Sequence, residues 1–118
     1  MGIELYNQQN AVSDDPYALV LKLYEGIIKY LSFAKSAINN GDVENNFTYI
    51  NKSIAIFDEL RNVLDFDGGE VAYYLDGLYL YQIETLFSAG VDDNLNSINQ
   101  VIKVVQGLID AWKEETGL

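Results

Sequence analysis

The sequence predicts an all-α fold: an antiparallel, up-down-up-down four-helix bundle with an extended N-terminal arm. In four successive segments, apolar residues recur every three or four positions, which is the spacing of one face of a helix. The connections between these segments are short, so neighbouring helices must run in opposite directions. A length of 118 residues suits one domain. We therefore expect a single domain over 1–118, with the arm at 1–14 and the bundle at 15–115.

The first helix is expected to start at Asp15 and to end at Asn39. Asp15 can accept a hydrogen bond from a free amide of the first turn, and Pro16 suits the next position because its ring fixes φ. Residues 1–13 show no periodicity, which predicts the arm. The inward face of this helix is predicted to comprise Val20, Leu23, Tyr24, Ile27, Leu31, Ala34 and Ile38.

A tight turn is predicted at Gly41 and Asp42, because glycine can take the left-handed conformation that ends a helix and aspartate can cap the next one. The second helix should run from this turn to about Leu64. Its core face is predicted to comprise Val43, Phe47, Ile50, Ile54, Phe57 and Leu64.

The third helix is expected to begin near Gly69 and to end at Ala89, because Gly90 would stop it. Asp92 or Asp93 would then cap the fourth helix. The predicted core faces are Leu75, Leu78, Tyr79 and Leu86 in the third helix, and Leu95, Ile98, Ile102, Val105, Ile109 and Trp112 in the fourth.

The composition excludes several classes of function. A net charge of −11 repels the phosphates of nucleic acid and of anionic lipid, so we expect no nucleic-acid partner and no membrane insertion. There is no cysteine for disulfides or thiol catalysis, which fits a reducing compartment such as the cytosol, and no basic-then-apolar leader marks the chain for secretion. Histidine, the commonest general base and metal ligand, is also missing. We expect no enzyme activity, no metal and no cofactor, with a carboxylate-only metal enzyme as the weakest alternative.

Three of the helices carry more apolar surface than one core face requires. The extra rows are Tyr49, Ile56, Leu60 and Val63 in the second helix, Tyr73, Leu80, Ile83 and Phe87 in the third, and Val101, Val104, Leu108 and Ala111 in the fourth. Wide apolar stripes can simply pack against two neighbouring helices. With nine tyrosines in the chain, they can equally form an open groove that takes amphipathic helices of a peptide partner. The residues predicted to bind this partner are Tyr49, Ile56, Leu60, Tyr73, Leu80, Val104 and Leu108.

Short motifs along nearly the whole chain resemble those of the FliS family of flagellar export chaperones. The first helix carries two of them, Asp15-Pro16-Tyr17-Ala18-Leu19 and Leu23-Tyr24-Glu25-Gly26. Asp15 stands where the family usually has serine, and Glu25 where it usually has aspartate. The later motifs are Gly41-Asp42, Leu64-Asp65, Gly68-Gly69-Glu70, Leu78-Tyr79-Leu80-Tyr81 and Ala111-Trp112-Lys113.

The resemblance implies a cytoplasmic chaperone that binds the disordered C-terminal region of flagellin. Such a chaperone prevents premature polymerisation and delivers flagellin to the flagellar type III export apparatus. It also implies that Ile3, Leu5 and Tyr6 of the arm occupy part of the groove until cargo displaces them. A flagellar regulator or a co-chaperone is a further partner that family membership allows. The alternative is a non-enzymatic helical module whose extra apolar rows form a homodimer interface or bind another client.

Overall fold

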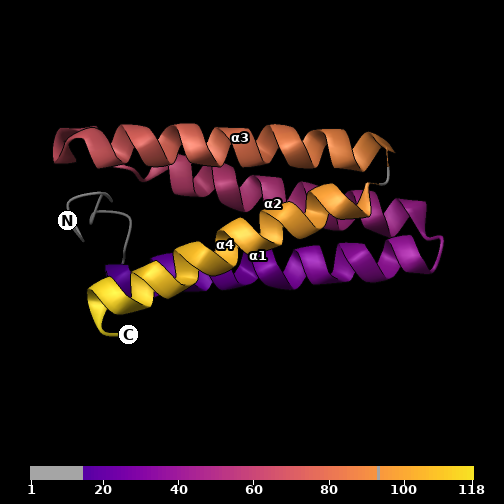
Figure 1. Cartoon of the computed structure of the whole chain (residues 1–118), viewed down its shortest axis with the longest axis horizontal. Helices are drawn as coiled ribbons and strands as arrows, with labels where there is room; N and C mark the ends of the chain where they lie inside the picture. The colour runs from indigo at the N-terminus through magenta and orange to yellow at the C-terminus, as the bar shows by residue number, and fades with distance from the viewer. Residues whose placement is uncertain (1–14, 93) are drawn as a thin grey trace.

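The computed structural model describes residues 15–92 and 94–118, which form four long helices and one short 3-10 turn (Figure 1). The elements are α1 (Pro16–Asn39), α2 (Val43–Asn62), η3 (Phe66–Gly68), α3 (Glu70–Asp92) and α4 (Leu95–Thr116). Each helix packs against the next with reversed direction, and α4 returns to pack on α1. The predicted up-down-up-down bundle is confirmed. The predicted arm at 1–14 lies outside the described residues.

The first two helices begin with the caps that the sequence predicts. The Asp15 carboxylate accepts a hydrogen bond of 2.9 Å from the backbone amide of Tyr17, and proline occupies the first turn. The Asp42 carboxylate accepts a hydrogen bond of 3.1 Å from the amide of Asn45. Between the two helices Gly41 has a φ of +70°, in the left-handed region.

Replacing Gly41 with alanine is expected to lower the free energy of unfolding by about 1 kcal/mol. A Cβ at this position would meet nothing within 4 Å, so the cost comes from the left-handed backbone alone. Gly77 is the matched control, because its Cβ would also enter open space but its backbone is helical. Gly77→Ala should raise stability by up to about 1 kcal/mol. Urea unfolding of both variants checks this, and an unchanged stability of Gly41→Ala would mean that the turn tolerates another conformation.

The third helix is longer than predicted, because Gly90 does not stop it. Gly90 lies inside α3 and is buried against α2, where an added Cβ would lie 3.7 Å from the side chain of Ile50. A glycine in a helix costs about 1 kcal/mol relative to alanine. The packing of this turn of α3 against α2 offsets that cost, and a Cβ at this distance would make an ordinary van der Waals contact. The predicted end of the helix at Ala89 was therefore wrong.

The predicted cap of the fourth helix was also wrong. Asp92 is the last residue of α3, and Asp93 lies outside the described residues. The cap is Asn94, whose side-chain oxygen accepts a hydrogen bond of 3.2 Å from the amide of Ser97. Because α3 continues for one more turn beyond Ala89, α4 starts later in the chain than predicted. Asn94, the residue that follows the two aspartates, is therefore its cap.

The core face of α2 differs from the predicted one. Val43 and Phe47, which were predicted to face inward, are exposed. The row that faces the core consists of Asn46, Ile50, Ser53, Phe57 and Leu60. In α4 the core likewise includes Val101, which the sequence placed in an outer row, whereas Ile102 is only half-buried. The inward face of α2 is thus rotated from the face that hydrophobicity alone selects. The inward face of α4 keeps Ile98, Val105, Ile109 and Trp112 as predicted and widens to include Val101.

Aromatic side chains join all four helices in the core. The hydroxyl groups of Tyr24 (α1) and Tyr79 (α3) share a hydrogen bond of 2.6 Å, and the ring of Phe57 (α2) lies 6.0 Å from that of Tyr79. Trp112 (α4) meets the Tyr24 ring edge-on at 6.4 Å and donates its indole N–H to the carbonyl of Tyr17 at 2.8 Å. These contacts hold both ends of the described chain in one packed unit.

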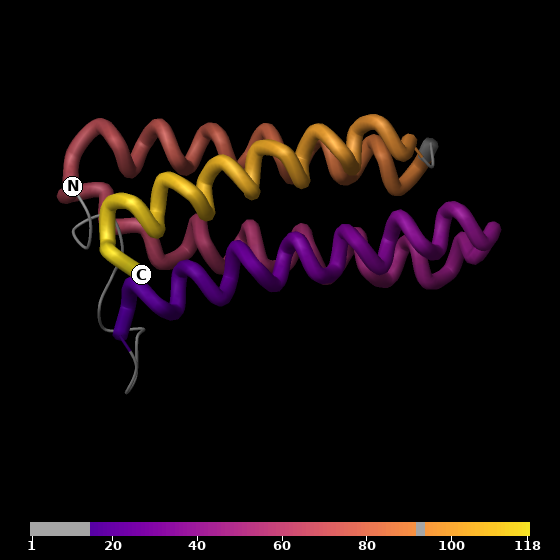
Figure 2. The backbone as a smooth tube through the Cα atoms, turned by 60° about the horizontal axis from the view of Figure 1, so that its bottom comes forward, coloured from indigo at the N-terminus to yellow at the C-terminus, as the bar shows by residue number. Residues whose placement is uncertain are grey.

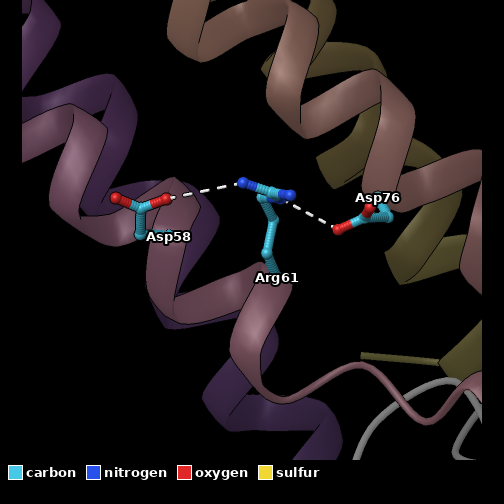
Figure 3. A network of polar contacts seen from close by, with 3 residues as sticks. All are labelled: Asp58, Arg61 and Asp76. Carbon is cyan, nitrogen blue, oxygen red and sulfur yellow. Dashed lines mark hydrogen bonds and ion pairs between the residues drawn. The ribbon is translucent and has the colours of Figure 1, made fainter.

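On the surface, Arg61 connects α2 to α3 (Figure 3). Its Nε donates a hydrogen bond of 2.8 Å to Asp76, and its Nη1 lies 3.8 Å from Asp58. The hydrogen bond to Asp76 and the charges of both carboxylates raise the pKa of Arg61, although burial opposes the shift. Two neighbouring acids thus offset this positive charge.

Candidate functional site

Helices α3 and α4 diverge along their length. They lie close together where the chain passes from one to the other and separate toward their far ends, as Figure 1 and Figure 2 both show. Helix α4 packs more extensively on α1 than on α3. The open end therefore lies between the first turns of α3 and the last turns of α4.

This open end contains an apolar pocket of about 180 Å³. No polar atom is exposed in its lining. A cavity on the order of 150 Å³ holds a benzene molecule, so the pocket has room for one aromatic or branched aliphatic side chain. We name it the α3/α4 groove, lined by Tyr24, Val71, Tyr74, Leu75, Leu108, Ala111 and Trp112.

The walls of the groove differ in their burial. Tyr24 and Trp112 are buried and form its rigid floor, where the aromatic packing of the core fixes them. Tyr74 stands at the rim with 68% of its surface exposed. Ala111 is exposed, and its small side chain leaves the mouth open beside half-buried Leu108. A preformed apolar floor with an accessible mouth suits the side chain of a peptide partner.

Two of the residues predicted to bind a partner lie on this side of the bundle. Leu108 lines the groove, and Val104 lies one turn before it on the same face of α4. Both side chains are half-buried. Of the outer apolar row predicted for the fourth helix, Leu108 and Ala111 line the groove, Val104 lies one turn before them, and Val101 belongs to the core.

Tyr73 and Leu80 lie on another face of α3. Both are exposed, and the ring of Tyr73 packs 4.8 Å from that of Phe66. Phe87 continues this row at the same seven-residue spacing and faces α2. There it borders a second apolar pocket, of about 320 Å³, lined by Phe47, Ile50, Asn51, Ile54, Phe87, Gly90 and Val91.

The remaining three predicted residues lie away from both pockets. Leu60 is fully buried and belongs to the core. Tyr49 packs between α1 and α2, and half-buried Ile56 lies against Gly26 of α1. The structure therefore does not gather the seven predicted residues into one site. The arm residues Ile3, Leu5 and Tyr6 lie outside the described part of the chain.

Sequence reasoning missed Val71 and Tyr74 as walls of the groove. A signal for them exists, because Val71, Tyr74, Leu78 and Tyr81 recur at helical spacing along one side of α3. This row was overlooked because the third helix is apolar almost all round.

The described residues offer little other chemistry. Within 15–92 and 94–118 there is no group of three or more acidic side chains placed to hold a metal ion. None of the helices in this part of the chain combines the length and apolar character needed to cross a membrane.

Comparison with known proteins identifies the family of this chain. The sequence matches the family described as "Flagellar protein FliS" over residues 2–116. It is 44% identical to the flagellar secretion chaperone FliS of Campylobacter jejuni, over 97% of this chain and 90% of that protein. Identity to the flagellar secretion chaperone FliS of Salmonella typhimurium is 33%, over 96% and 88% of the two chains. For the protein of the same name from Bacillus subtilis it is 31%, over 91% and 80%. The chain belongs to the FliS family of flagellar secretion chaperones.

Proposed function

We propose that this chain binds the C-terminal region of flagellin, keeps it unpolymerised and hands it to the flagellar type III export apparatus. The observation that carries the proposal is the α3/α4 groove, an open pocket with an apolar lining and an aromatic floor. An apolar side chain of the cargo would enter the pocket beside Leu108 and Ala111.

A disordered cargo must lose conformational entropy when it becomes ordered on the chaperone. Burying a large apolar area offsets this loss, and one pocket alone is too small to do so. The exposed row Tyr73, Leu80 and Phe87 extends the apolar surface along α3 toward the second pocket. We therefore place cargo contacts at Leu108 in the groove, at Val104 one turn before it on α4, and at Tyr73 and Leu80 on α3. Leu60, Tyr49 and Ile56 contribute to the bundle itself.

Two further features of the family complete the proposal. Ile3, Leu5 and Tyr6 would occupy the groove in the absence of cargo, so removal of 1–14 should speed cargo association. A flagellar regulator or co-chaperone would need a surface that cargo leaves free.

The test is a titration of the full chain with a peptide covering the C-terminal region of flagellin from the same genome. We expect a saturable one-to-one complex, a gain of helix content by circular dichroism and a negative heat-capacity change by calorimetry. The control peptide carries aspartate at its apolar helix positions and should not bind. Absence of binding, both by the full chain and by a chain lacking 1–14, would refute the proposal.

The homodimer alternative is tested by solution mass. A tight dimer would bury the groove and make cargo binding depend on chaperone concentration. If the chain stays monomeric at concentrations well above the dissociation constant of its complex with the peptide, the homodimer alternative is excluded.

A further inference from the structure

Positive charge is concentrated on one side of this strongly acidic protein. Helix α1 carries Lys22, Lys29 and Lys35 but only one acidic residue, Glu25, whereas the whole chain has a net charge of −11. Lys52 of α2, the helix that packs beside α1, adds another positive charge.

Two of these lysines converge on one aromatic ring. The ammonium group of Lys29 lies 5.8 Å from the ring centroid of Tyr30, and that of Lys52 lies 5.4 Å from the same centroid. In the part of the chain that the structure describes, neither ammonium group has a carboxylate within ion-pair distance. Cation–π contacts at exposed sites are worth only about 0.5–1 kcal/mol, so they offset little of the charge of the two lysines. Both side chains are exposed, and their ammonium groups are accessible to the carboxylates of a partner.

Further aromatic side chains extend this site across the two helices. The rings of Tyr30 and Tyr49 stack at 6.1 Å with an angle of 22°, and Phe33 packs 5.1 Å from Tyr49. Phe33 remains 43% exposed. Apolar surface thus lies beside unpaired positive charge. We name this surface the α1/α2 patch, comprising Lys29, Tyr30, Phe33, Tyr49 and Lys52.

The patch lies on the opposite side of the bundle from the α3/α4 groove. On α1, Phe33 follows Tyr24 of the groove floor by nine residues, or two and a half helical turns, so the two side chains leave the helix on opposite sides. None of the five patch residues lines the groove. A molecule bound at the α1/α2 patch would leave the mouth of the groove free. Both surfaces can therefore be occupied at the same time.

We propose that the α1/α2 patch docks an acidic segment of a second protein, in which carboxylates lie beside an aromatic or aliphatic side chain. The carboxylates pair with Lys29 and Lys52, and the apolar side chain packs on Phe33. The proposal does not depend on flagellin binding, because it uses a separate surface.

Charge complementarity favours a short peptide segment over an anionic membrane. Exposed charges act over about 8 Å at physiological ionic strength. A short acidic segment is therefore attracted mainly by the lysines that it touches. A flat anionic lipid surface also comes close to many acidic residues of the protein, which repel it. The charge of Arg61 adds nothing here, because Asp76 and Asp58 offset it.

The proposal is tested with the full chain, labelled with ¹⁵N, and a synthetic 15-residue helical peptide that places glutamates on either side of a phenylalanine. We expect saturable shift changes at the α1/α2 patch and an affinity that falls with salt. The double substitution Lys29→Glu and Lys52→Glu should weaken binding at least tenfold. The matched control, Lys103→Glu with Lys113→Glu, makes the same change in net charge on α4 and should leave binding within twofold.

Four results would overturn the proposal. The first is no shift change at millimolar peptide. The second is equal binding of a peptide with glutamine in place of glutamate. The third is a set of shifts that maps to the α3/α4 groove instead. The fourth is co-sedimentation with phosphatidylglycerol vesicles that requires Lys29 and Lys52, while the peptide fails to bind; this would assign the patch to lipid.

Discussion

Replacing Ala111 with aspartate is expected to weaken binding of a flagellin C-terminal peptide at least a hundredfold while leaving the bundle folded. Ala111 is exposed, so the new side chain fits without disturbing the core. Its carboxylate would stand at the mouth of a pocket whose lining exposes no polar atom. Burying an unpaired carboxylate under cargo costs several kcal/mol, and a hundredfold loss of affinity requires only about 2.7 kcal/mol.

Asn99→Asp provides the matched control for this substitution. It adds the same negative charge to an exposed position of the same helix, away from the residues that line the groove. Calorimetric titration should give this variant nearly the affinity of the unmodified chain. If Ala111→Asp binds equally well, the groove is not where cargo binds, and the exposed row on α3 becomes the better candidate.

The largest loss of stability is expected from Phe57→Ala, at about 3–5 kcal/mol. Phe57 has no exposed surface and packs against Tyr79 in the middle of the core, so its removal leaves a cavity. Phe47→Ala makes the same chemical change on the same helix, but Phe47 is 42% exposed. It should cost less than about 1 kcal/mol.

Urea unfolding of the two phenylalanine variants measures this difference directly. The sequence alone placed both side chains in one inward row, which predicts similar costs. Similar measured costs would therefore mean that α2 is rotated from the orientation described above. A large cost for Phe57 alone would support the core row that contains Asn46 and Ser53.

Features that depend on a few adjacent residues could be predicted from the sequence. The caps at Asp15 and Asp42 and the turn at Gly41 belong to this group, because each is fixed by a side-chain acceptor or a left-handed glycine close to the helix end. The effect of Gly90 on the third helix could not be predicted from its neighbours in the sequence. Whether a glycine ends a helix or fits against a neighbouring one depends on a residue far away in the chain, here Ile50.

The orientation of α2 and the position of the groove depend on tertiary packing. Asn46 and Ser53 face the core, so the most hydrophobic row of the helix is not its most buried row. The groove exists because α3 and α4 diverge, and periodicity within one helix carries no information on the angle to another. Sequence reasoning therefore found Leu108 on one wall but missed Tyr74 on the other.

Trp112 is the only tryptophan of the chain and forms part of the floor of the groove. Trp112 is 95% shielded from solvent, and it lines the pocket that we propose for a cargo side chain. A cargo peptide without tryptophan emits almost no fluorescence when the protein is excited at the long-wavelength edge of indole absorption. The protein therefore carries its own optical reporter, and the emission of a single residue can follow occupancy of the groove in real time without any label.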